Sequence, residues 1–191
     1  MRSREIHLNN LSGKVKLIVF FQIIFIFIFS CSSGSADSAD DLIEQAFPKI
    51  SDSNYDLSIQ DFKNVGFKAL REYKSVEELP PLKSAFHGIY KKMDYELRFY
   101  ADHFEASEYG FKDADKVTGK ESIVTGDVPW EDGEKDRRRC SRPPGQPHSG
   151  CNYTSKYGDY VIFGNVIVMC EGKDILESRN TCSNLLSLLK E

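Results

Sequence analysis

The expected fold is decided by the stretch Tyr160-Val-Ile-Phe163, Gly164-Asn165, Val166-Ile-Val-Met-Cys170 near the C-terminus. Two apolar runs around a two-residue turn that begins with glycine predict a β-hairpin with a type II′ turn. Neither run alternates with polar residues, so both strands are expected to lie in the centre of a sheet. A C-terminal helix is expected to follow, with a buried side formed by Leu176, Leu185, Leu186, Leu188 and Leu189.

Residues 85–100 predict a second hairpin that is buried on one face only. Residues 85–90 are expected to pair with residues 94–100, which alternate apolar and polar side chains, as in a half-buried antiparallel strand. Asp102 then provides an N-cap for a helix, which Gly110 is expected to divide into two pieces. The two faces of the alternating strand are Tyr95, Leu97, Phe99 and Glu96, Arg98, Tyr100.

The segments 85–118 and 159–190 share the order strand, turn, strand, acidic cap, helix, which suggests a duplicated ββα unit. Two such units would form a small antiparallel sheet with helices on one face, which is an α+β fold. Residues 51–82 predict an irregular region with short helices. Residues 119–158 are rich in glycine, proline and charge and predict a long irregular loop region.

The composition describes an ordinary folded chain. Its 191 residues fit one domain, and 40% apolar with 28% charged residues is typical of globular proteins. These values exclude a multi-pass membrane protein, a collagen, a coiled coil and a mainly disordered chain. The net charge of −4 gives no reason to expect nucleic-acid binding.

The N-terminus has the features of an export signal. Basic residues precede an apolar run of 13 residues, 17–29, in which only Gln22 is polar. A helix of that length spans roughly 20 Å, whereas the hydrocarbon core of a bilayer is roughly 30 Å thick. The run therefore fits the apolar region of a signal peptide better than a stable membrane span.

The motif Ile28-Phe29-Ser30-Cys31 resembles the lipobox of bacterial lipoprotein precursors, with Ile28 in place of the commoner leucine and a bulkier Phe29. The resemblance implies cleavage before Cys31 and attachment of a diacylglycerol to its thiol. Residues 1–30 are then a signal peptide, 31–41 a lipid-anchored flexible tether and 42–191 a single α+β domain. Cleavage near Ala36 and an uncleaved anchor are the alternatives, and all three carry the rest of the chain across a membrane.

Four cysteines remain if Cys31 carries lipid, which predicts two disulfides in an exported domain. Local pairing, Cys140–Cys151 with Cys170–Cys182, is favoured, and a cross pairing is the alternative. A helix that starts at Asp174 would place Cys182 about 12 Å along its axis, so the second pair is expected to need a later start. No cysteine pair has the spacing of a structural zinc site, so no metal is expected.

The candidate binding residues lie in the loop region. Guanidinium groups can hold a phosphate, sulfate or carboxylate, and the alternative is that they pair with this protein's own acidic side chains. The single tryptophan is either an anchor for the loop or a surface on which a ligand stacks. These low-ranked ligand-binding candidates are Trp130, Arg137, Arg138, Arg139 and Arg142.

The sequence thus predicts a lipid-anchored protein on the extracytoplasmic side of the cell envelope, with a non-catalytic binding or interaction domain. Its expected partners are the membrane, through the N-terminal lipid, and an anionic small molecule or an envelope protein, but no nucleic acid. No catalytic residue, nucleotide motif or cofactor is identified. An enzyme with its site on residues 119–158 and a structural envelope protein are the alternatives.

Overall fold

The computed structural model describes residues 47–51, 54–141 and 150–190, which belong to one compact unit, Ser38–Glu191. The predicted signal peptide, lipobox and tether lie outside these residues, as does Arg142. Across the described ranges, no helix combines the length and apolar character needed to cross a membrane.

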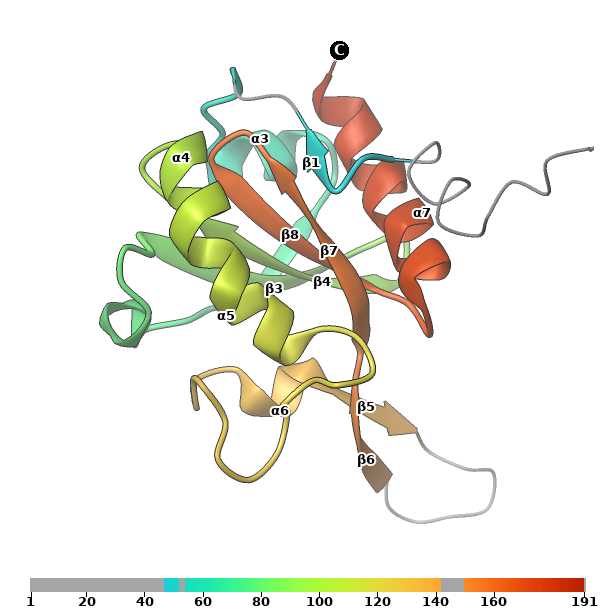
Figure 1. Ribbon diagram of the computed structural model, residues 1–191. Coiled ribbons are helices and arrows are strands. Elements are labelled where there is room, and N and C mark those ends of the chain that lie inside the picture. The colour runs from blue at the N-terminus through green and yellow to red at the C-terminus, as the bar shows by residue number, and fades with distance from the viewer. Residues whose placement is uncertain (1–46, 52–53, 142–149, 191) are drawn as a thin grey trace, which may run out of the picture. The chain divides into compact units, whose positions relative to one another are not determined.

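The described unit is built on a six-stranded sheet in the order β1-β7-β8-β4-β3-β2 (Figure 1). All neighbours are antiparallel except β1, which runs parallel to β7 at the edge. The α+β fold class is confirmed, with a larger sheet than predicted. The strands are β1 (Ile50–Ser51), β2 (Lys68–Glu72), β3 (Ser84–Tyr90), β4 (Met93–Phe99), β7 (Tyr157–Phe163) and β8 (Val166–Glu171).

Both predicted hairpins are confirmed, but the expected half-burial of residues 94–100 is wrong, because both faces of β4 (Met93–Phe99) are buried from Tyr95 onward. Phe163 pairs with Val166 across Gly164-Asn165, and Gly164 has a φ of 58° while Asn165 does not enter the positive range, as a type II′ turn requires. Every residue of β7 is buried, and so is all of β8 except its last residue. The other hairpin turns through Lys91-Lys92 between β3 and β4.

The sheet is covered on both faces, so the prediction of helices on one face is wrong. α7 (Ile175–Leu186) and α3 (Ile59–Asn64) contribute to the core on one face, while η2 (Ala106–Gly110) and α5 (Phe111–Val117) contribute to the core on the other (Figure 1). The physical reason lies in β8, where Val168 faces the first core and Met169 the second. A strand that is apolar on both sides needs a cover on both sides.

The helix expected after the second hairpin begins as predicted, but it is not divided as predicted. Asp102 caps α4 (His103–Glu105) by accepting a hydrogen bond from the Glu105 backbone N–H at 2.8 Å. Gly110 does not divide the helix, because it ends a π-helical turn that leads directly into α5.

The C-terminal helix is confirmed, with one wrong residue. Leu185 and Leu186 are buried, and Leu188 and Leu189 of η3 (Ser187–Leu189) pack partly against the same core. Leu176 was expected on the buried side but is 42% exposed.

Two regions expected to be irregular contain regular elements. Residues 119–158 hold α6 (Glu134–Arg137) and a two-stranded sheet of β5 (Arg138–Ser141) and β6 (Gly150–Ser155). Residues 51–82 hold the expected short helices, α3 and η1 (Val76–Glu78), and also the strand β2, which was not predicted.

A disulfide joins Cys170 of β8 to Cys182 of α7, with the two Cα atoms 5.5 Å apart. This is the favoured pairing, although the helix starts at Ile175 and not later, as the pairing was expected to require. The helix runs back along β8, because Ser178 contacts Cys170 and Cys182 contacts Val168. Cys140 is also disulfide-bonded. In the β5–β6 strand pairing, the residue opposite Cys140 is Cys151.

Candidate binding groove

The structure places the strongest sequence candidates inside the protein. Arg137 is 1% exposed and donates from Nε and Nη2 to the Glu96 carboxylate at 2.9 and 3.2 Å. Arg98 donates from Nε to the same carboxylate at 2.8 Å, and both Glu96 and Arg98 are fully buried. We call Glu96, Arg98, Arg137 and Trp130 the buried cluster.

Trp130 completes the buried cluster and anchors its own loop. The Arg137 guanidinium carbon lies 4.7 Å from the centroid of the indole ring, close enough for a cation–π contact. The indole N–H donates to the backbone carbonyl of Ser75 at 3.0 Å. This arrangement matches the anchor interpretation of Trp130, because its ring is buried.

The two arginines set the ionisation of Glu96. Burial alone would raise the pKa of Glu96, but the guanidiniums of Arg137 and Arg98 outweigh burial and hold that pKa below its ordinary value. The carboxylate therefore stays charged inside the protein. An ion pair in such a place depends on each partner, because removing one leaves an uncompensated buried charge.

The remaining arginine candidates do not converge on one space. The Nε of Arg138 lies 3.7 Å from the Glu134 carboxylate, whereas Arg139 donates to the backbone carbonyl of Gly172 at 2.7 Å. Arg137 pairs with the protein's own acid, as the alternative interpretation expected. Anion binding by Arg138, Arg139 and Arg142 stays a prediction.

A groove lies elsewhere, where the end of α5 and the loop after it face the first turn of α7. Its volume is about 690 Å³, within the range of sites that hold small molecules. A second hollow of about 390 Å³ shares Lys49 and Asp115 with it and continues along α5 to Phe111. The main groove is lined by groups that include Lys49, Asp115, Gly158, Asp159, Ile175 and Leu176.

Gly158 allows the two walls of the groove to meet. A Cβ atom at this position would lie 2.5 Å from the backbone oxygen of Asp174, so only glycine lets β7 pass this close to the start of α7. On the other wall, the Gly119 backbone N–H donates to the Tyr157 carbonyl at 2.9 Å. Close backbone contacts with β7 thus position both walls of the groove.

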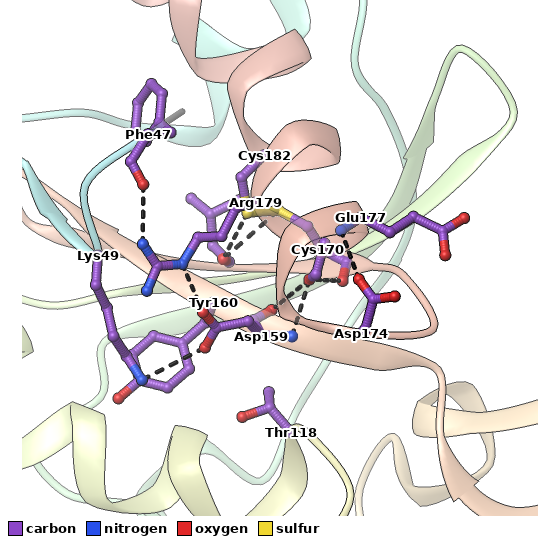
Figure 2. A network of polar contacts seen from close by, with 12 residues as sticks. Phe47, Lys49, Thr118, Asp159, Tyr160, Cys170, Asp174, Glu177, Arg179 and Cys182 are labelled. Carbon is purple, nitrogen blue, oxygen red and sulfur yellow. Dashed lines mark hydrogen bonds and ion pairs between the residues drawn. A yellow bond between two sulfur atoms is a disulfide. The ribbon is translucent and has the colours of Figure 1, made fainter. Parts of the chain in front are cut away.

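Asp159 lines the groove, and Figure 2 shows the polar contacts that it forms. Its carboxylate accepts a hydrogen bond from Arg179 Nε at 2.5 Å, and Arg179 Nη1 donates to the Phe47 carbonyl at 2.8 Å. Its backbone N–H donates to the Ser178 hydroxyl at 2.8 Å. Asp159 thereby connects the sheet, α7 and the segment that enters β1.

Lys49 crosses the groove from the β1 side. Its ammonium group lies 3.5 Å from an Asp115 carboxylate oxygen and 3.4 Å from one of Asp159. It also lies 4.2 Å from the centroid of the Tyr160 ring. Burial and a 2.7 Å hydrogen bond to Asp115 raise the pKa of Tyr160, so its hydroxyl remains a donor. We call Lys49, Asp115, Asp159 and Arg179 the groove cluster.

The acidic groups that line the groove are already engaged. Lys49 contacts both Asp115 and Asp159, and the Asp174 carboxylate caps α7 by accepting from the Glu177 backbone N–H at 2.8 Å. Lys120 and Lys173 also line the groove, but no acidic group among the described residues forms an ion pair with either ammonium group. The Glu177 carboxylate accepts a hydrogen bond from the backbone N–H of Lys173 at 2.9 Å. The groove therefore offers two accessible ammonium groups.

The apolar part of the groove lies beside these lysines. Ile175 and Leu176 are 45% and 42% exposed, although both are large aliphatic side chains in the first turn of α7. The arrangement combines apolar surface with accessible positive charge, which suits binding. In the described part of the chain, no three His, Cys, Asp or Glu side chains are grouped for a metal ion.

The sequence analysis did not identify any of the groove residues as part of a binding site. Lys49, Asp115, Asp159 and Arg179 come from four separated segments, and no spacing motif joins them. The one available signal was Leu176, an apolar residue two positions after the acidic cap Asp174, which was assigned to the core.

Residues 58–191 match DUF6810, a family of unknown function, and the chain belongs to this family. The match includes every element from α3 to the C-terminal helix, and thus all the groove residues named above except Lys49. No curated protein and no solved structure matches the chain.

Proposed function

We propose that this protein is an exported, lipid-anchored component of the cell envelope whose α+β domain binds a small molecule without converting it. The proposal that the domain binds a small molecule rests on the groove between α5 and α7, which has exposed aliphatic side chains and accessible lysines. Adjacent exposed aliphatic side chains that line one concave volume, as Ile175 and Leu176 do, are typical of a binding site.

Two features support export. The first is the basic and apolar leader that ends at Ser30-Cys31. The second is the Cys170–Cys182 disulfide, together with a disulfide-bonded Cys140, because such bonds persist in oxidising compartments.

The position of Lys49 supports a role close to the membrane. Lys49 lies 18 residues after Cys31, which limits the distance from a lipid on Cys31 to Lys49 to roughly 60 Å even for an extended chain. A ligand would therefore be held near the bilayer surface.

Mass spectrometry of protein extracted from native membranes tests the anchor. The expected mass lacks residues 1–30 and includes a diacylglycerol on Cys31. A Cys31→Ala variant is expected to leave the membrane fraction, whereas the matched Ser33→Ala variant stays. A product that begins at Met1 with all cysteines reduced would contradict export.

Native mass spectrometry of the same material tests binding. A small-molecule adduct is expected on the wild-type protein and on Leu70→Asp, which alters an exposed leucine far from the groove in sequence. The adduct is expected to be absent from Leu176→Asp. An adduct that survives Leu176→Asp, or no adduct on any of the three proteins, would contradict binding in the groove.

A further inference from the structure

We propose that the ligand of the groove is an amphiphile with a single anionic group. Its acyl or comparably apolar body would lie against Ile175 and Leu176, and its carboxylate or phosphate would contact Lys120 and Lys173. This inference rests on the proposed function and names the class of molecule that the same groove accepts.

The apolar body follows from the walls of the groove. Ile175 and Leu176 are adjacent, both line the groove and both keep more than two fifths of their surface exposed. Burying such surface against an apolar ligand is the main favourable term for binding. Apolar side chains continue into the second hollow, which Phe111 and Ile162 line.

An elongated ligand follows from the way the two hollows meet. They share Lys49 and Asp115, whose charged groups are 3.5 Å apart and whose side chains are 39% and 52% exposed. An ion pair this exposed contributes little to stability and can separate at low cost. A chain-like ligand can therefore extend from the main groove into the second hollow.

The negative charge follows from which groups are already paired. Lys49 and Arg179 contact Asp159, Lys49 and Tyr160 contact Asp115, and the Asp174 carboxylate caps α7. The ammonium groups of Lys120 and Lys173 remain available for an anion. Because Asp174 already occupies the N-terminus of α7, the anion is assigned to the lysines and not to the helix end.

The test uses residues 32–191 in detergent-free buffer, because detergent would compete with the probes. This part contains the whole described sheet and both of its cores, and circular dichroism checks that each variant is folded. Calorimetry then compares decanoate with decanol and decyltrimethylammonium, which have the same chain length and different charge. All probes are used below their micelle concentrations.

Decanoate is expected to bind at least about fivefold more tightly than decanol, since one charge contact contributes on the order of 1 kcal/mol. Affinity is expected to fall about fourfold for each methylene removed from decanoate to octanoate. The double variant Lys120→Ala/Lys173→Ala is expected to lose this preference for decanoate while it binds decanol unchanged. Lys63→Ala, at an exposed lysine of α3, is the matched control.

Three results would overturn the inference. The first is that decanol or decyltrimethylammonium binds as tightly as decanoate, and the second is that the double lysine variant binds decanoate as tightly as the wild type. Sedimentation with phosphatidylglycerol vesicles provides the third criterion, because binding to vesicles without binding to monomeric decanoate would assign this surface to a bilayer. Each of these failures leaves the anchor result and the native adduct unaffected, so it is distinguishable from failure of the proposed function.

Discussion

The buried cluster and the groove cluster use the same chemistry in opposite surroundings. In the buried cluster, Glu96 holds two arginines under Trp130, and no member is open to water. In the groove cluster, Asp159 is nearly buried, but Lys49 and Asp115 are 39% and 52% exposed. Both clusters join the sheet to a covering layer, and the groove cluster lies beside an unfilled volume.

The comparison shows that concentrated charge does not by itself indicate a binding site. Arginine is the most versatile donor for anions, and four arginines near one loop made residues 137–142 the natural candidate. The protein uses Arg137 internally, where it holds the loop of Trp130 against the sheet. The accessible charges are isolated lysines that no motif marks.

The largest expected difference between the two clusters is the effect of removing one carboxylate. Glu96→Gln is expected to lower the free energy of unfolding by roughly 3–5 kcal/mol, because it leaves two guanidiniums buried without a counter-charge. Urea unfolding measures the change. Glu121→Gln, at an exposed glutamate, is the control and is expected to change stability by less than about 0.5 kcal/mol. A loss below about 1 kcal/mol for Glu96→Gln would show that the buried cluster is not what holds this layer.

Low pH is expected to remove part of the stability that the Glu96 carboxylate contributes. The pKa of Glu96 is held below its ordinary value of 4.5 in the folded state, so its stabilising effect is complete above that pH and is lost as pH falls toward the folded pKa. The stability difference between wild type and Glu96→Gln should therefore shrink as pH falls below about 4.5. Urea titrations across this range test it, and a difference that grows with acid would reverse the sign assigned here.

The sequence predicted the hairpins because local signals specify them. A glycine-first turn between two apolar runs, and strict alternation in residues 94–100, both depend on neighbours along the chain. The same alternation led to the wrong prediction that only one face of this strand is buried. It places Glu96 and Arg98 on one face of β4, but it does not say whether another layer covers that face.

The layer that covers this face could not be predicted because its signals are not local. Trp130 and Arg137 come from a segment with little periodic pattern, and their burial depends on partners in β4 and at Ser75. The groove was missed for a related reason, since it forms where the end of α5 and the start of α7 meet beside β7. Its residues have ordinary roles in sequence, such as a cap, a glycine and an exposed leucine.

An intermediate effect is expected at Gly158, where the groove depends on backbone contact. Gly158→Ala places a Cβ within 2.5 Å of the Asp174 oxygen, and the strain is expected to cost roughly 1–3 kcal/mol. Gly150→Ala is the matched control, because a Cβ there meets nothing within 4 Å. Thermal unfolding compares the two variants. Equal behaviour would mean that β7 and the start of α7 can separate freely.

The smallest expected effect is that of Asp115→Asn, which keeps an oxygen for Tyr160 and removes the charge that faces Lys49. The exposed ion pair should contribute less than about 1 kcal/mol, and high salt should abolish the difference. Asp113→Asn breaks the comparable surface pair with Lys116 and should behave alike in stability. Only Asp115→Asn removes a negative charge from the groove, so it alone should bind decanoate more tightly, by about twofold to fivefold. Should Asp115→Asn destabilise the fold as much as Glu96→Gln, the groove cluster would be a structural element like the buried one, and its exposure would not mark a binding site.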